Sequence, residues 1–246
     1  RKYDEANRDR DRVQFLASVY PVEPLTITGS VIFGKDKFKD SAFGLIEDRH
    51  NIYSIDTDYA VSERCDLFLF YSYERYESDQ KARQWRSGGI GDPNTETTYD
   101  SNSNWDADSE DRVDTVGSGL NFAIKPKKLD FNLSYSFSKS DGEIMLSSPL
   151  GTTSDDNNAW TPVNFTEVDD SKLHTFNANV KYTFKKGPSI TLGYMWEKFD
   201  ISDFNLDGFE YIPTTTTDAY SGSLLMDTLL EDYNAHVIYT KFTYSF

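Results

Sequence analysis

Apolar and polar residues alternate with a period of two along nine segments of the chain. These segments cover residues 12–20, 25–34, 51–61, 66–76, 112–124, 129–139, 173–184, 189–199 and 233–246. In the sixth segment the odd positions from Leu129 to Phe137 are apolar or aromatic, and the even positions from Asp130 to Ser136 are polar. Successive side chains of a strand point to opposite faces, so this period predicts β-strands with one apolar and one polar face.

The connections between these predicted strands alternate between short and long. Short turns are expected at 21–24, 62–65, 125–128 and 185–188, and long loops at about 35–50, 77–111, 140–172 and 200–232. Outer-membrane barrels have short periplasmic turns and long extracellular loops, and about ten tilted residues cross their apolar layer. The pattern therefore predicts an all-β fold, an antiparallel transmembrane β-barrel of the bacterial outer membrane.

The number of predicted strands is odd. Bacterial single-chain barrels have an even number of strands, and an open sheet edge cannot face lipid because its backbone groups would stay unpaired. We therefore expect further strands before Arg1 and interpret residues 1–246 as the C-terminal part of a single, larger barrel domain. If the short turns are periplasmic, the final strand must also end in the periplasm, at Phe246.

Composition separates this reading from intrinsic disorder. Apolar residues make up only 37% of the chain, but aromatic residues make up 15%, and disordered chains are poor in aromatics. A barrel reconciles the two values because only every second strand residue meets lipid. The net charge of −16 is external to the predicted strands, since 77–112, 140–172 and 200–232 carry −5, −6 and −8. No basic stripe for nucleic acid is present.

The two faces of the predicted strands suggest two environments. We expect contact with lipid at Phe131, Leu133, Tyr135, Phe176, Tyr182, Ile238, Phe242, Tyr244 and Phe246. We expect the lumen or a partner to contact Thr26, Thr28, Ser30, Asp56, Asp58, Gly117, Gly119, Asn132, Ser134, Asn177, Asn179 and Lys181. This short, polar lining indicates a wide lumen that holds water or another protein, and composition alone favours water. The two glycines indicate either close approach of another backbone or a bend in the wall.

Few residues suggest chemistry. The single cysteine, Cys65, excludes an internal disulfide and a Cys-x-x-Cys-His haem attachment, and the three histidines lie far apart, so no catalytic or cofactor role is predicted. The only metal candidate is a weak calcium site at Asp106, Asp108 and Glu110. A solvated acidic loop explains these carboxylates better, because the glycine and spacing of a calcium-binding loop are missing.

Several segments, in order along nearly the whole chain, resemble the MtrB/PioB family. They are Arg1-Lys2-Tyr3, Asn7-Arg8-Asp9-Arg10-Asp11, Pro21-Val22-Glu23-Pro24-Leu25-Thr26-Ile27, Gly44-Leu45 with Glu47, Tyr53-Ser54-Ile55-Asp56 and Asp111-Arg112-Val113-Asp114-Thr115-Val116-Gly117-Ser118-Gly119. The final strand, with aromatic Phe246 at its end, is similar to the signal that the barrel assembly machinery reads. These motifs are structural and name no active residue.

The resemblance implies a function that the alternation cannot. Family members are large barrels that sheathe a periplasmic multihaem c-type cytochrome and support electron transfer across the outer membrane, with an extracellular multihaem cytochrome as a second expected partner. By resemblance, this chain forms the C-terminal strands of such a sheath, and its partner carries the haem. A porin-like channel for small solutes is the alternative.

Overall fold

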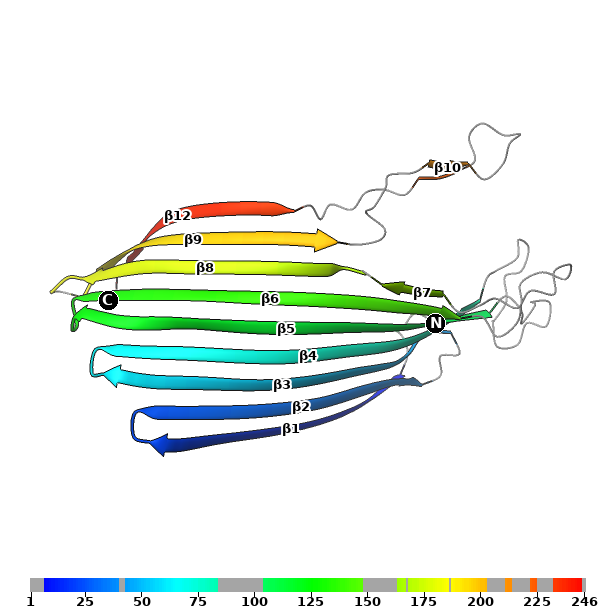
Figure 1. Cartoon of the computed structure of the whole chain (residues 1–246), viewed down its shortest axis with the longest axis horizontal. Coiled ribbons are helices and arrows are strands. Elements are labelled where there is room, and N and C mark those ends of the chain that lie inside the picture. Colours follow the sequence, from blue (N-terminus) through cyan, green and yellow to red (C-terminus); the bar gives the residue numbers. More distant parts are fainter. Residues whose placement is uncertain are drawn as a thin grey trace, which may run out of the picture.

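The computed structural model describes residues 7–39, 43–83, 104–147, 163–166, 168–185, 187–202, 211–213, 222–224 and 232–244. Ten strands among them form one antiparallel sheet, in the order β1-β2-β3-β4-β5-β6-β8-β9-β12 with β7 paired to β6. Figure 1 shows this sheet as a curved wall of long strands lying side by side. The described residues include no helix long and apolar enough to cross a membrane.

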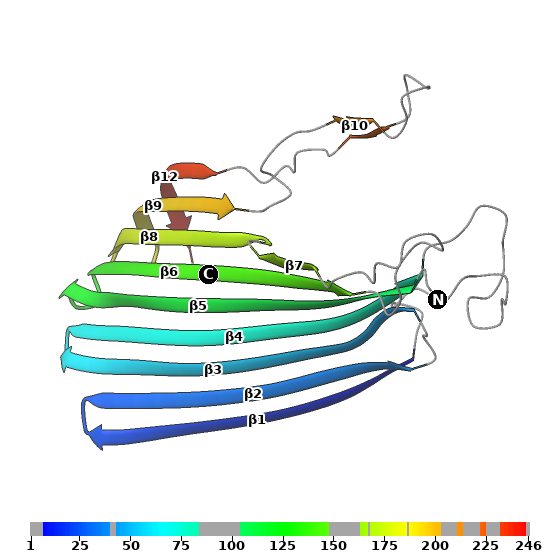
Figure 2. The same cartoon turned by 45° about the vertical axis from the view of Figure 1, so that its right-hand side comes forward.

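Strands that follow one another in the sequence are neighbours in the sheet, as in a β-meander. The long strands are β1 (Asn7–Val22), β2 (Leu25–Lys39), β3 (Gly44–Ser62), β4 (Cys65–Arg83), β5 (Asn104–Lys125), β6 (Leu129–Ser147), β8 (Asp170–Thr183), β9 (Ser189–Ser202) and β12 (Tyr233–Thr243). Three short strands are β7 (Val163–Thr166), β10 (Tyr211–Pro213) and β11 (Gly222–Leu224), of which the last two pair with each other. Figure 2 shows the four short turns at one end of the sheet.

The strands are longer than the apolar alternation predicted, and this corrects the predicted loops. β2 continues to Lys39 and β3 begins at Gly44, so most of 35–50 is strand. β4 and β5 likewise take 77–83 and 104–111 from the second loop. The third predicted loop loses its first residues to β6 and its last residues to β8. The fourth loses its first residues to β9. Charged cross-strand pairs replace apolar contacts in these extensions, which therefore lack a hydrophobic period.

The sheet has almost no interior core. Ala107 and Val168 are the only buried apolar side chains in the described part of the chain. Large apolar side chains such as Phe15, Leu192 and Ile238 are 64%, 57% and 77% exposed. A wall one sheet thick, whose apolar side chains are exposed instead of packed in a core, is the form that a transmembrane barrel requires.

Candidate functional site

Cross-strand pairing assigns each strand residue to one of two faces, because directly opposed residues project from the same side of a sheet. On the apolar face, Phe131 opposes both Phe122 and Val180, and Val180 opposes Leu192. The same pairing places seven of the predicted lipid-facing residues on this face: Phe131, Leu133, Tyr135, Phe176, Tyr182, Ile238 and Phe242. Tyr244 follows β12, and Phe246 lies outside the described residues. Their contact with lipid stays a prediction.

The opposite, polar face carries every residue predicted to meet the lumen or a partner. These are Thr26, Thr28, Ser30, Asp56, Asp58, Gly117, Gly119, Asn132, Ser134, Asn177, Asn179 and Lys181. One row illustrates the pairing: Asp58 opposes Phe68, Phe68 opposes Gly119 and Gly119 opposes Ser134. The sequence therefore predicted which residues share a face, although contact with a lumen or partner stays a prediction.

Short polar side chains on the polar face bind one another across neighbouring strands. The pairs are Ser18 with Thr28 at 2.9 Å, Ser54 with Ser30 at 3.2 Å, Thr115 with Ser138 at 2.9 Å and Asn132 with Asn179 at 2.9 Å. In the last pair the amide of Asn132 donates to the side-chain oxygen of Asn179. These short side chains satisfy part of their hydrogen bonding with each other and do not extend far from the sheet. Where they occur, the surface of the polar face is hydrophilic.

On the polar face, aromatic rings cover glycines of the adjacent strand. The rings and the glycines are far apart in the sequence, so the sequence alone did not reveal these contacts. A Cβ built on Gly117 would lie 2.4 Å from the ring of Phe70, and one on Gly193 would lie 2.2 Å from the ring of Tyr239. Gly119 faces the ring of Phe68 in the same way, at 2.4 Å. The expected close approach of another backbone is found at Gly119, where a built Cβ would also lie 2.4 Å from the carbonyl oxygen of Leu133. At Gly117 the close neighbour is the ring of Phe70, and ring-on-glycine pairs of this kind are known to support strand glycines.

A charged cluster lies on the polar face, where the first residues of β1 pair with the last residues of β2. The guanidinium of Arg10 donates to both carboxylate oxygens of Asp36, at 2.8 and 2.7 Å, and Arg8 lies 3.3 Å from the same group. Asp36 is only 8% exposed, so its charge is compensated where water is scarce. The ring of His50 stacks on Tyr76 nearby, with centroids 5.1 Å apart. The cluster is a paired, structural one with no nucleophile.

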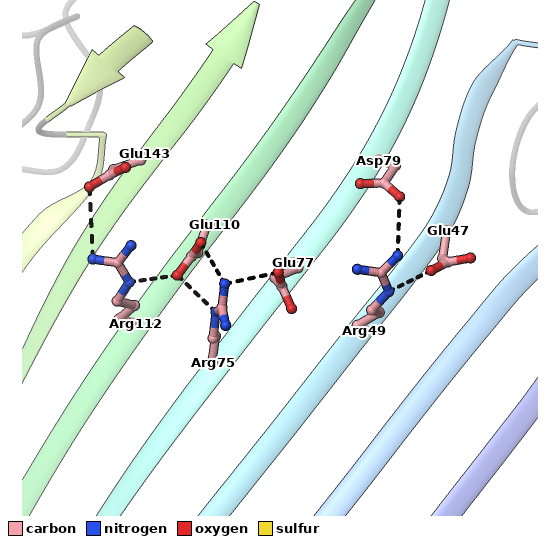
Figure 3. A network of polar contacts seen from close by, with 8 residues as sticks. All are labelled: Glu47, Arg49, Arg75, Glu77, Asp79, Glu110, Arg112 and Glu143. Atoms are coloured by element: carbon pink, nitrogen blue, oxygen red, sulfur yellow. Dashed lines mark hydrogen bonds and ion pairs between the residues drawn. The ribbon is translucent and has the colours of Figure 1, made fainter.

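The apolar face ends in a band of ion pairs, which Figure 3 shows across β3 to β6. Glu110 accepts two hydrogen bonds from Arg75, at 2.8 and 2.9 Å, and one from Arg112 at 2.5 Å. Arg49 pairs with Glu47 at 2.5 Å in the same band. Arg75 and Arg112 are directly opposed across β4 and β5, and the shared glutamate offsets the repulsion between them.

The calcium candidate falls in this band and is not assembled there. Asp106, Asp108 and Glu110 occupy alternate positions of β5, an extended strand rather than a loop, and the carboxylate of Glu110 binds arginines. The three side chains project side by side from one face of the strand, whereas a calcium ion needs about six to eight oxygens that converge on one point. Within the described ranges, no group of three or more His, Cys, Asp or Glu side chains is placed to hold a metal ion.

Histidine and tryptophan side chains on the apolar face have aromatic or amide partners. Nδ1 of His174 is 2.8 Å from the hydroxyl of Tyr135, and the indole N–H of Trp196 donates to Asn234 at 2.7 Å. A second tyrosine–histidine pair, Tyr194 with His236, has the same 2.8 Å separation. These amphipathic groups lie between the apolar residues and the charged band, where the aromatic girdle of a barrel is expected.

Comparisons with known proteins agree with this architecture. The family model described as "Putative outer membrane beta-barrel porin, MtrB/PioB" matches residues 1–246. Outer membrane protein MtrB of Shewanella baltica (strain OS185) is 26% identical over 204 residues, which cover 82% of this chain and 26% of that relative. The chain thus spans about a quarter of the relative's length. Copper transporter OprC shares the fold, with a TM-score of 0.60 and 8% identity over 96% of this chain and 35% of its own.

Proposed function

Because the chain belongs to the MtrB/PioB family of outer-membrane β-barrel porins, we propose that its sheet forms part of a sheath around a multihaem c-type cytochrome. In this role the barrel supports electron transfer across the outer membrane, to extracellular acceptors or from extracellular donors. The observation that carries the proposal is that one face of the sheet is mainly apolar, whereas the other carries mainly polar side chains together with a few rings such as Phe68 and Phe70. The family resemblance supplies the identity of the guest.

The physical case starts from the membrane. Its hydrocarbon core is about 30 Å thick, and a charge placed in it is costly. A soluble redox protein can therefore cross only inside a polar passage. The polar face offers such a passage, lined by asparagine, serine and threonine side chains that stay close to the wall. With a single cysteine the chain has no Cys-x-x-Cys-His motif, so the proposal assigns the haem groups to the partner.

A porin-like channel for small solutes is the second candidate. The same short, polar lining that would accept a protein guest would also accept water and solutes, and both readings fit the family description as a porin. The two functions differ in what fills the lumen of the complete barrel. That difference can be tested with residues that the register places on known faces.

We expect photo-crosslinkers on the polar face of the complete barrel, in cells, to capture a haem-staining protein. Asn132 and Asn179 are suitable positions because they oppose each other on that face. Leu133 and Val180 are matched controls on the apolar face of the same two strands, and crosslinkers there should capture no cytochrome. The measurement is haem staining of the crosslinked bands.

Deleting the barrel should abolish electron exchange with extracellular acceptors or donors and leave the uptake of small solutes unchanged. If crosslinkers on both faces recover no cytochrome and the deletion blocks uptake of a nutrient, the sheath function is wrong and the channel function is correct.

A further inference from the structure

Two neighbouring short turns concentrate positive charge in a chain whose net charge is −16. The turn between β5 and β6 contributes Lys125, Lys127 and Lys128, and the turn between β8 and β9 contributes Lys185. We call these four residues the lysine rim; Lys186, the next residue, lies outside the described ranges. The long connections at the other end of the sheet are strongly acidic, so the two ends differ in the sign of their charge.

One backbone hydrogen bond joins the first turn to the end of β8, next to the second turn. The amide of Thr183, at the end of β8, donates to the carbonyl of Lys128 at 2.8 Å. Lys128 in turn donates to the carbonyl of Lys125 at 2.9 Å, which closes its own turn, and Lys127 adopts a left-handed φ of 63°. The rim is therefore a single surface fixed by the sheet.

The rim lysines are available for a ligand. Lys125, Lys127 and Lys185 are exposed, and Lys128 is half-buried. The lysines that form ion pairs in the described part of the chain are Lys35, Lys39, Lys139 and Lys198, and none of these belongs to the rim. Four ammonium groups that have no carboxylate partner among the described residues form a local positive field that favours an anion.

Aromatic contacts connect the rim to the membrane-facing side of the sheet. The ammonium of Lys128 lies 5.2 Å from the ring centroid of Tyr182, a residue of the apolar face. The ring of Phe184 packs edge-on against the same tyrosine, with centroids 4.9 Å apart. Lys125 also opposes an apolar-face residue, Leu129. An apolar strip that ends in aromatic rings and then in lysines matches the order of layers at a membrane–water interface.

We propose that the lysine rim binds the phosphate groups of anionic phospholipids in the periplasmic leaflet of the outer membrane. The charge of the rim complements a phosphate, and its contacts with Tyr182 and Leu129 aim it at the lipid side of the wall. A partner inside the lumen would instead meet the polar face. The proposal does not rest on the cytochrome-sheath function, and it gives the short turns a role in holding the barrel at a defined depth.

The test uses the complete barrel, purified and placed in nanodiscs of equal parts phosphatidylglycerol and phosphatidylcholine. Native mass spectrometry then counts the lipids that remain bound. We expect phosphatidylglycerol to exceed phosphatidylcholine by about fivefold or more, the order expected for even one lysine near a charged membrane surface. The variant Lys125→Gln/Lys127→Gln/Lys185→Gln should bring the ratio close to one. Salt should lower the ratio for the unmodified barrel.

The matched control, Lys35→Gln/Lys139→Gln/Lys198→Gln, removes the same charge from ion-paired lysines on the extensions and should keep the ratio of the unmodified barrel. Heat-modifiable migration on a gel checks that both variants are folded, and the single substitution Lys127→Gln replaces the triple one if it does not fold. An unchanged ratio in the rim variant, or an equal loss in both variants, overturns the proposal. So does a rim variant that keeps its lipid ratio but loses an acidic soluble partner.

Discussion

At the residue scale, glycines set the closest contacts within the wall. Gly117, Gly119 and Gly193 each lie under an aromatic ring of the adjacent strand, and all three are on the polar face. A side chain at any of these positions would occupy space that the ring already fills. At Gly29, by contrast, the nearest atom to a built Cβ is 4.0 Å away, so a methyl group would fit there without displacing a neighbour.

We expect Gly119→Ala to destabilise the complete barrel by about 1–3 kcal/mol, the usual cost of overpacking. The new Cβ would lie 2.4 Å from both the carbonyl oxygen of Leu133 and the ring of Phe68. Because the oxygen belongs to the backbone, Phe68→Leu should not restore stability. Gly29→Ala is the control and should be near neutral. The measurement is the temperature at which the heat-modifiable band is lost.

The covered Gly117 offers a contrasting case for the same measurement. Its built Cβ meets mainly the ring of Phe70, at 2.4 Å, with Ser136 farther away at 3.1 Å. Phe70→Leu should therefore rescue much of the loss in Gly117→Ala. If the ring substitution rescues both glycine variants, or rescues neither, the distinction is wrong. A new Cβ would then not be blocked by the backbone at Gly119 and by the ring at Gly117.

At the scale of the element, each long strand consists of two parts that different forces hold in register. One part alternates apolar and polar residues, and the other continues as an extension with charged pairs on the apolar side. In β5, for example, Leu120 and Phe122 belong to the first part, and Glu110 and Arg112 belong to the second. A shift of one residue would exchange the faces of both parts, so the register of every strand is strongly specified.

Spin labels on β12 test this register. Phe242 opposes Ile190 on the apolar face, and Lys241 opposes Thr191 on the polar face. We expect a label at 242 to report lipid and a label at 241 to report water. Phe242 shares a cross-strand row with Tyr182, next to the lysine rim, so we expect Phe242→Arg to cost only about 0–1 kcal/mol, the value for a site near the membrane interface. Accessibility to oxygen and to a water-soluble relaxing agent distinguishes the two positions. The reverse result would invert every face assignment on this strand.

At the scale of the whole molecule, the sheet is curved but open. Within the described residues β1 and β12 each pair with one neighbour, so both outer edges keep unpaired backbone groups. Such edges are not tolerated in lipid, and a functional wall must pair them. The family assignment and the shared fold with OprC identify a barrel as the closed form.

We expect residues 1–246, expressed alone, not to form a closed and heat-modifiable monomer. The physical reason is that the described sheet leaves its two edge strands without a second partner. The measurement is migration of the refolded fragment on a gel before and after heating, with the complete barrel as the positive control. A folded, heat-modifiable monomer of the fragment would show that β1 and β12 can pair with each other and would favour a small barrel.

The amino-acid sequence by itself determined the fold class, the positions of the short turns and the two faces of the strands. Phe131 and Asn132 illustrate why: side chains of adjacent strand residues point to opposite faces, so a local alternation already separates them. The family resemblance was also visible in the sequence, because motifs such as 111–119 are contiguous.

Only the tertiary structure decided where the strands end, what covers the glycines and what the acidic residues bind. The extension of β5 depends on Arg75 reaching Glu110, which lies 35 residues away in the sequence. The ring of Phe70 similarly reaches Gly117 from another strand. No local pattern encodes such contacts, since they form only when the register of two strands brings distant residues together. Alternation is a property of one strand, whereas pairing is a property of two.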